Sequence, residues 1–161
     1  MKGDAKLIEV LNQLLAEELT AISQYMVHSE MCDGWGYEKL HKAIGGQAMD
    51  EMHHAEWLIQ RILFLEGTPN LAKREALKVG KNVPDMLKAD LDVEYRVVGE
   101  LKKAIAACEK AQDYVSRDML VVQLEDTEMD HAYYLEQQVR LISLVGLKNY
   151  QQSQMKPGTP A

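Results

Sequence analysis

The sequence predicts an all-α protein: a four-helix bundle with one long crossover connection and a short fifth helix at its C-terminal end. Three observations support this fold class. Apolar residues recur at spacings of three and four through four long stretches, as on one face of a helix. There are only four prolines, and Leu, Ala, Glu, Lys and Met dominate over Val and Ile, which favours helix. One of the three connections between these stretches is much longer than the other two.

The first two predicted helices cover residues 4–30 and about 37–65, and a short turn joins them. The first has its apolar face at Leu7, Leu11, Leu14, Leu15, Leu19 and Ile22. The pair Asp33-Gly34 is expected to end it, because these residues are common in turns. The second has its inward residues at Leu40, Ile44, Ala48, Ala55, Leu58, Ile62 and Leu65, and the Gly67-Thr68-Pro69-Asn70 segment should end it.

The connection after the second helix is long. The stretch to about Val83 lacks helical periodicity and contains Gly80, so no regular structure is expected there. Pro84 then stands at a favoured first-turn position of the next helix. Short connections make neighbouring helices antiparallel, whereas this long one lets the third helix run parallel to the second. The result is the single-crossover topology of one class of four-helix bundle.

The remaining elements are three helices and a tail. The helices are predicted at residues 84–110, 114–145 and, as the short fifth helix, 147–154. Gly146 is expected to stop the fourth helix. The tail from about residue 155 contains Pro and Gly and is expected to be loose. We expect residues 1–161 to form a single domain, since this length can bury a substantial core.

Composition narrows the range of partners and locations. The formal net charge is -7 at pH 7, so nucleic acid and anionic membranes are poor partners, whereas cations are favoured. No apolar run approaches the roughly 20 residues that span a bilayer, and the polar start of the chain does not predict a signal peptide. Cys32 and Cys108 form no motif and are expected at opposite ends of the bundle, too far apart to pair. A cytoplasmic location fits these features.

Two Glu-x-x-His pairs carry the functional information. They are Glu51-x-x-His54 and Glu128-x-x-His131, each near the middle of a predicted helix. Residues three apart share a helix face, so each pair offers one carboxylate and one imidazole to the same point. One further glutamate stands near the middle of each remaining long helix, at Glu18 and at Glu94. Two such pairs with two extra glutamates form the ligand set of a di-iron carboxylate centre.

A single Glu-x-x-His pair is weak evidence, because an exposed helix salt bridge gives the same pattern. Glu38-x-x-His41 is a third match, near the start of its helix, and is interpreted as a surface pair. The full set of six is different, since all six are expected to face inward. Buried carboxylates are costly unless they are paired or bind a metal, so the sequence predicts two metal ions in the bundle.

At this point the chain resembles the bacterioferritin family over essentially its full length. The resemblance rests on Met1-Lys2-Gly3-Asp4, Asp33-Gly34-Trp35-Gly36, Asp50-Glu51-Met52, Arg61-Ile62-Leu63-Phe64-Leu65-Glu66-Gly67, Asp113-Tyr114-Val115-Ser116-Arg117-Asp118 and Gly146-Leu147-Lys148-Asn149-Tyr150. It implies a hollow shell of 24 subunits built from two-fold dimers. It also implies a ferroxidase centre made by Glu18, Glu51, His54, Glu94, Glu128 and His131, and haem b held between paired subunits by Met52 from each.

The expected function is therefore iron storage and detoxification. Fe(II) would be oxidised by oxygen or peroxide, and ferric mineral would collect in the shell. Glu51 and Glu128 would bridge the irons, and haem would serve electron passage from a reductant such as a ferredoxin during iron release. The resemblance also allows a second subunit type in such a shell. The alternatives are a di-iron redox enzyme of the rubrerythrin or oxygenase type, and a non-enzymatic haem-binding bundle in which Met52 merely fills a subunit interface.

Two departures from the family affect these expectations. Gly46 stands where relatives often carry a His on the inner shell surface, which leaves Asp50 as the remaining candidate for an inner iron site. The fourth helix also looks one residue longer before Glu128. If so, a π-bulge between about Leu120 and Thr127 is expected to restore the inward direction of both ligands.

Four other side chains receive simple expectations. Tyr25 lies a helical step from Glu18 and is expected inward, either as a packed core residue or as a partner of a ligand. The three histidines outside the two central pairs are interpreted as surface residues: His28, His41 and His53.

Overall fold

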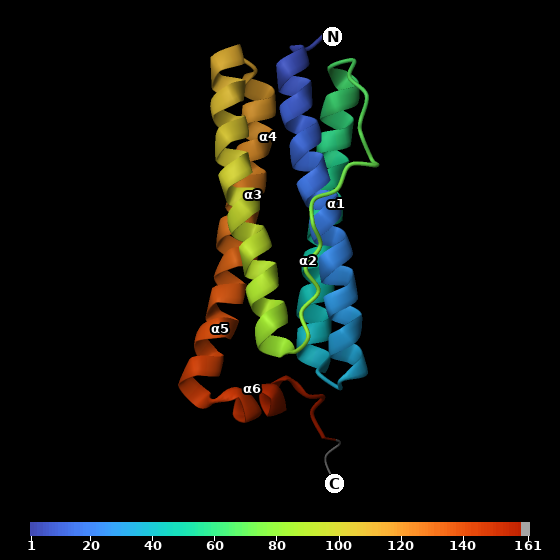
Figure 1. Ribbon diagram of the computed structural model, residues 1–161. Coiled ribbons are helices and arrows are strands. Elements are labelled where there is room, and N and C mark those ends of the chain that lie inside the picture. Colours follow the sequence, from blue (N-terminus) through green and yellow to red (C-terminus); the bar gives the residue numbers. More distant parts are fainter. Residues whose placement is uncertain (159–161) are drawn as a thin grey trace.

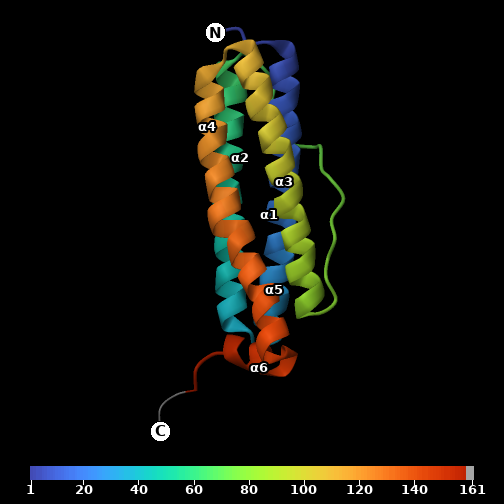
Figure 2. The ribbon, with the colours of Figure 1, turned by 90° about the vertical axis from the view of Figure 1, so that its left-hand side faces the viewer.

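Four long helical rods lie side by side in the computed structural model, which describes residues 1–158, and a short helix crosses one end of them (Figure 1). The elements are α1 (Ala5–Gly34), α2 (Glu38–Phe64), α3 (Val83–Ala111), α4 (Tyr114–Glu125), the π-helix η1 (Asp126–Ala132), α5 (Tyr133–Val145) and α6 (Leu147–Gln154). The segment η1 joins α4 and α5 into one continuous rod (Figure 2). No strand occurs in residues 1–158, so the predicted all-α class is confirmed.

The topology is the predicted single crossover. In Figure 1, α1 runs down the bundle and α2 returns beside it. Residues 65–82 then carry the chain back along the outside, so that α3 starts at the opposite end and runs parallel to α2. The rod made of α4, η1 and α5 is antiparallel to α3. This arrangement brings the middles of all four rods to one level.

The helix ends follow from local hydrogen bonds. Asp4 caps α1, where its carboxylate accepts from Lys6 N at 2.7 Å, and Asn82 caps α3, where its amide oxygen accepts from Asp85 N at 2.9 Å. The expected stop of the first helix at Asp33-Gly34 was wrong by one turn. These residues remain helical, and the left-handed residue beyond the helix is Gly36, with φ of 86°.

The crossover is tied to α1 by three side chains spaced four residues apart. Thr20 Oγ1 accepts from Glu75 N at 2.8 Å, and Gln24 Oε1 accepts from Lys78 N at 3.0 Å. His28 Nε2 accepts from Gly80 N at 2.9 Å. The interpretation of His28 as a surface residue was therefore wrong, because the crossover covers it completely.

The second ring nitrogen of His28 is also engaged. Its Nδ1 lies 2.8 Å from Asp90 Oδ1, and both side chains are fully buried. Sequence periodicity alone could not show this, because the crossover that buries His28 has no periodic pattern of its own. The histidine thus links α1, the crossover and α3.

Leucine is the most frequent residue of the buried core. Fully buried examples are Leu11, Leu15, Leu40, Leu58, Leu87, Leu101, Leu120 and Leu135. Cys32 and Cys108 are both buried free thiols, in line with the expectation that they do not pair. None of the helices in the described part of the chain combines the length and apolar character that crossing a membrane requires.

A stability prediction arises from the two adjacent glycines of α2. At Gly46 an added Cβ would meet nothing within 4 Å, whereas at Gly45 it would lie 2.9 Å from Ser29 Oγ. We expect Gly46→Ala to stabilise the protein by about 1 kcal/mol, because Gly is that much less favourable than Ala inside a helix. The thermal midpoint should rise by roughly 2–4 °C for a chain of this size.

Gly45→Ala is the matched control. It adds the same methyl group, yet Ser29 Oγ donates to His41 O at 2.8 Å and would have to move. Calorimetry of the two variants should therefore rank Gly46→Ala above Gly45→Ala. The reverse order would contradict the packing argument.

Candidate metal centre

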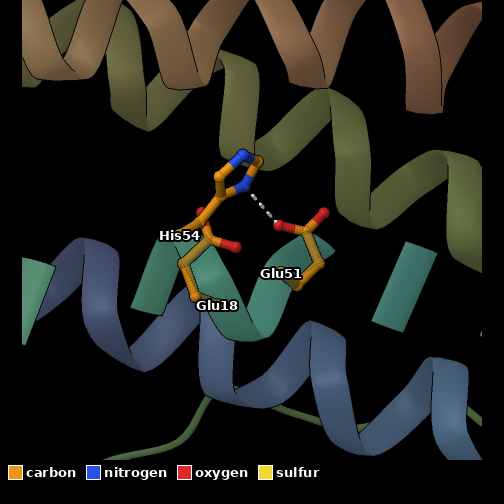
Figure 3. Close-up of side chains that lie close together, drawn as sticks. All are labelled: Glu18, Glu51 and His54. Atoms are coloured by element: carbon orange, nitrogen blue, oxygen red, sulfur yellow. Dashed lines mark hydrogen bonds and ion pairs between the residues drawn. The ribbon is translucent and has the colours of Figure 1, made fainter. Parts of the chain in front are cut away.

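Five buried side chains from all four rods meet at the middle of the bundle. They are Glu18 from α1, Glu51 and His54 from α2, Glu94 from α3 and His131 from η1, and each is at most 2% exposed. We call them the five-residue cluster. They form two groups of three, Glu18–Glu51–His54 (Figure 3) and Glu51–Glu94–His131, whose ligand atoms all lie within 4.8 Å of one another.

Glu51 belongs to both groups. Its Oε2 lies 2.8 Å from His54 Nδ1, and its Oε1 lies 2.7 Å from His131 Nδ1. One carboxylate therefore faces two imidazoles from different rods. This geometry suits a carboxylate that bridges two cations, each of which would also have one imidazole.

The outer nitrogens of the two imidazoles contact aspartates in a crossed pattern. His54 Nε2 lies 3.1 Å from Asp126 Oδ2, and His131 Nε2 lies 3.2 Å from Asp50 Oδ2. Such contacts fix the orientation of a histidine that binds a metal through its other nitrogen. Sequence reasoning missed Asp126. Its position five residues before His131 becomes a signal only once a π-helix, with its bonds between residues five apart, is known.

Glu128 does not join the five-residue cluster. Its side chain is 43% exposed, and its Oε1 lies 2.8 Å from Lys102 Nζ on the surface. The expectation that Glu128 faces inward was wrong, and the reason is the π-helix. In an α-helix Glu128 and His131 would share a face, but the wider turn of η1 separates residues three apart.

The predicted π-distortion is present but lies further along the chain. We expected it between about Leu120 and Thr127, and it covers Asp126–Ala132. It turns His131 into the bundle, as anticipated, but not Glu128. The inward positions of this rod are instead Gln123, Thr127 and His131, which are spaced four apart and all buried.

Two oxygens of the five-residue cluster are buried without a hydrogen-bond partner among the described residues. They are Glu18 Oε2 and Glu94 Oε2. In each case the other oxygen is held: Glu18 Oε1 accepts from the Gln123 amide, and Glu94 Oε1 accepts from the Tyr25 hydroxyl. Buried polar atoms nearly always have a partner, so unpaired carboxylate oxygens in this place fit cation ligands.

Burial and crowding change the protonation of these carboxyl groups. Burial, the neighbouring Glu51 charge and Glu94 raise the pKa of Glu18 well above its usual value. Burial and the Glu51 charge raise the pKa of Glu94 to about 7. Although burial disfavours a charged imidazole, hydrogen bonds to Glu51 and Glu94 raise the pKa of His131 to about 11. Without a cation, the site therefore holds protons at neutral pH.

A prediction about proton release follows. Metal ligands must be deprotonated, so metal binding at this site should displace the protons that Glu18 and His131 hold. As the pH rises through the pKa of Glu94, about 7, fewer protons remain to be displaced. The apparent affinity for Zn(II) should therefore increase with pH between about 6 and 8. Calorimetry in two buffers of different ionisation enthalpy measures the proton number directly, and an uptake of protons would contradict this assignment.

Met52 lies on a different face, away from the five-residue cluster. It is 39% exposed and lines a groove of about 370 Å³ between α1 and α2. The apolar lining consists of Ile22, Met26, Ala48, Met49 and Met52. His41 and Lys42 stand in the same groove. The groove thus combines a soft thioether with apolar walls and two nitrogen-bearing side chains.

Of the two remaining histidines that were predicted to lie on the surface, one is exposed and the other is half-buried. His53 is exposed, as expected, and its ring lies 3.6 Å from Glu56. His41 is half-buried, and its Nδ1 lies 3.0 Å from Ser29 Oγ. Glu38 pairs with Lys42 at 2.8 Å, whereas His41 contacts Ser29 of α1. The third Glu-x-x-His match therefore does not form the surface pair that was expected.

Comparisons with known proteins agree with this architecture. The family model described as Ferritin-like domain matches residues 8–145. The chain is 53% identical over 155 residues to a protein named bacterial ferritin from Synechocystis sp., which covers 96% of this chain and 99% of that relative. It is 48% identical over 155 residues to the bacterial ferritin of Pseudomonas aeruginosa (96% and 100% covered). It is 40% identical over 161 residues to the bacterioferritin of Brucella melitensis (100% and 99% covered).

Proposed function

This chain belongs to the ferritin family, and we propose that it stores iron by oxidising Fe(II) at the five-residue cluster and keeping the ferric product inside a hollow shell. The observation that supports oxidation is the pair of ligand groups that share Glu51. Each group offers two carboxylates and one imidazole, which are suitable ligands for Fe(II). Two adjacent Fe(II) ions could each give one electron to the same oxidant molecule.

The proposed reaction has a simple balance. Two Fe(II) ions give one electron each, and dioxygen takes both electrons with two protons to form hydrogen peroxide, which can itself serve as an oxidant. Bound Fe(II) is the substrate, and the protein supplies the ligands and the protons that leave Glu18 and His131 on metal binding. Glu51 would contact both ions, with Glu18 and Glu94 as the terminal carboxylates.

A route for Fe(II) to the centre is available beside the imidazoles. A cavity of about 360 Å³ is lined by Asp50, His53, His54, Trp57, Asp126, Asp130 and His131. Three of these are aspartates, which favour a cation over an anion. We propose this cavity as the passage between the surface and the five-residue cluster.

We also propose assembly into a shell of 24 subunits built from two-fold dimers. Several large apolar side chains are exposed on the single chain, among them Phe64, Leu71, Leu77, Leu141, Leu144 and Val145. Burial of such side chains would favour association with other copies of the chain. A second subunit type in the shell and a cytoplasmic location belong to the same proposal.

Haem b is proposed for the groove that contains Met52. The groove fits because it offers apolar walls and a thioether, and Lys42 and His41 could meet acidic haem side chains. Met52 occurs once per chain, so haem held by Met52 would be shared with Met52 of a second copy across a two-fold axis. Bound haem would supply one-electron chemistry, with a ferredoxin-type reductant as the electron source for iron release.

The test combines oxygen consumption with particle size. On addition of Fe(II), the assembled protein should consume oxygen at about one molecule per two irons, and microscopy should show an electron-dense core within a hollow particle. A di-iron redox enzyme would consume oxygen without forming a core. A purely haem-binding bundle would do neither, and either outcome would refute iron storage.

A rubrerythrin-type enzyme is the weaker alternative on structural grounds. The only cysteines in the chain, Cys32 and Cys108, are both buried. Burial raises the pKa of Cys32 to about 12 and that of Cys108 to about 11. The chain therefore offers no pair of thiolates for an additional iron.

A further inference from the structure

The two terminal carboxylates of the five-residue cluster share one arrangement. In each, Oε1 accepts a hydrogen bond from a buried side chain, and Oε2 has no partner among the described residues. For Glu94 the donor is the Tyr25 hydroxyl; for Glu18 it is the Gln123 amide. The hydrogen-bond donor therefore occupies Oε1 of each glutamate and leaves Oε2 without a partner among the described residues.

Gln123 reaches this place from the last turn of α4. It is fully buried, and its own Oε1 is also without a partner among the described residues. A fully buried carboxamide with an unpaired oxygen costs stability unless the site uses it. Thr127, one turn further, donates to the backbone oxygen of Gln123 at 2.8 Å and does not contact its side chain.

The rod that contains η1 therefore contributes no carboxylate to the five-residue cluster, and its Asp126 contacts only the outer nitrogen of His54. Glu128, its expected acidic contribution, pairs with Lys102 on the surface. The inward residues are the uncharged Gln123 and Thr127 and the imidazole of His131. Of these, Gln123 is the one whose side chain contacts Glu18.

We propose that Gln123 is a positioning residue for the metal position formed by Glu18, Glu51 and His54. Its amide holds Glu18 Oε1, so that Oε2 is the oxygen offered to the metal. The other position, formed by Glu51, Glu94 and His131, relies on Tyr25 for the same purpose and does not depend on Gln123. This inference rests on the proposed two-metal site and deepens it.

The test measures Zn(II) affinity in two backgrounds that each leave one position. Glu94→Ala leaves the Glu18 position, and Glu18→Ala leaves the Glu94 position. Gln123→Met removes the amide at nearly constant volume. In the Glu94→Ala background it should weaken Zn(II) binding by about 10–100-fold, the usual cost of losing a group that orients a ligand. In the Glu18→Ala background the affinity should change by less than about twofold, because Glu18, the ligand that Gln123 holds, is then absent.

Thr127→Val is the matched control, because it alters the same buried face without touching Glu18. It should leave Zn(II) affinity unchanged in both backgrounds. Gln123→Asn, which keeps an amide but shortens its reach, should reproduce the selective loss and replaces the Met variant if that chain does not assemble. The visible spectrum of bound Co(II) should change only in the Glu94→Ala background.

The outcomes separate this inference from the proposed function. If the unaltered protein does not bind two Zn(II) ions per subunit, the two-metal site itself is wrong. If it binds two, and Gln123→Met or Gln123→Asn weakens neither position or both equally, the site stands and the role of Gln123 is overturned.

Discussion

Glu51→Ala is expected to abolish rapid Fe(II) oxidation, with a loss of more than about 100-fold in the initial rate, since even orienting groups around metals contribute 10–100-fold. The reason is that Glu51 faces both His54 and His131, at 2.8 and 2.7 Å. Its removal takes a carboxylate from both ligand groups at once. Stopped-flow absorbance of the ferric product measures the rate.

Glu128→Ala is the decisive control. The sequence pattern predicts the same bridging role for Glu128 as for Glu51. The structure, however, places Glu128 on the surface beside Lys102. Exposed ion pairs contribute little, so the rate should stay within about twofold of the unaltered protein. A loss as large as that of Glu51→Ala would show that Glu128 turns inward when iron binds, and the five-residue cluster would then lack one of the iron ligands.

Met52→Leu is expected to remove nearly all bound haem while Fe(II) oxidation continues. Leucine has a similar volume and costs little in stability, but it lacks the sulfur that an axial ligand requires. Met52 lines the groove between α1 and α2, and the five-residue cluster lies inside the bundle. The two properties should therefore separate. The haem-to-protein ratio after loading, and the absorbance typical of bis-thioether ligation, report the result.

Met49→Leu provides the comparison, because Met49 lines the same groove and is 50% exposed. It should keep the haem and the bis-thioether spectrum. If Met52→Leu retains that spectrum, Met52 is not the ligand. If both variants lose haem equally, the groove needs thioethers for packing rather than for ligation.

Much of the fold was available from the sequence. The apolar spacing located α2 to within one residue at each end, and the long aperiodic stretch before Pro84 gave the single crossover. The apolar spacing is a local property of the helix, and the crossover follows from the length of the connection alone. The end of α1 was less certain, because Asp33 and Gly34 are compatible with both a turn and a last helical turn.

Part of the candidate site could also be predicted from the sequence, and part could not. Regular helix geometry sufficed to bring Glu51 and His54 to one face, and their mid-helix position sufficed to set their level. The role of Glu128 could not be obtained like this, because the argument assumed 3.6 residues per turn through a segment that forms a π-helix. Even a correct expectation of a π-distortion placed it several residues too early.

The sequence by itself determined the number of long helices, their order and the four members of the five-residue cluster that lie on regular helix, Glu18, Glu51, His54 and Glu94. Only the tertiary structure decided which residues of the fourth rod face the centre. The reason is that the place where this rod becomes a π-helix depends on its packing against the other three rods. It also decided that the crossover buries His28 and that Gln123 holds Glu18. These contacts join residues 52 and 105 positions apart in the chain, and periodicity within one helix carries no information about them.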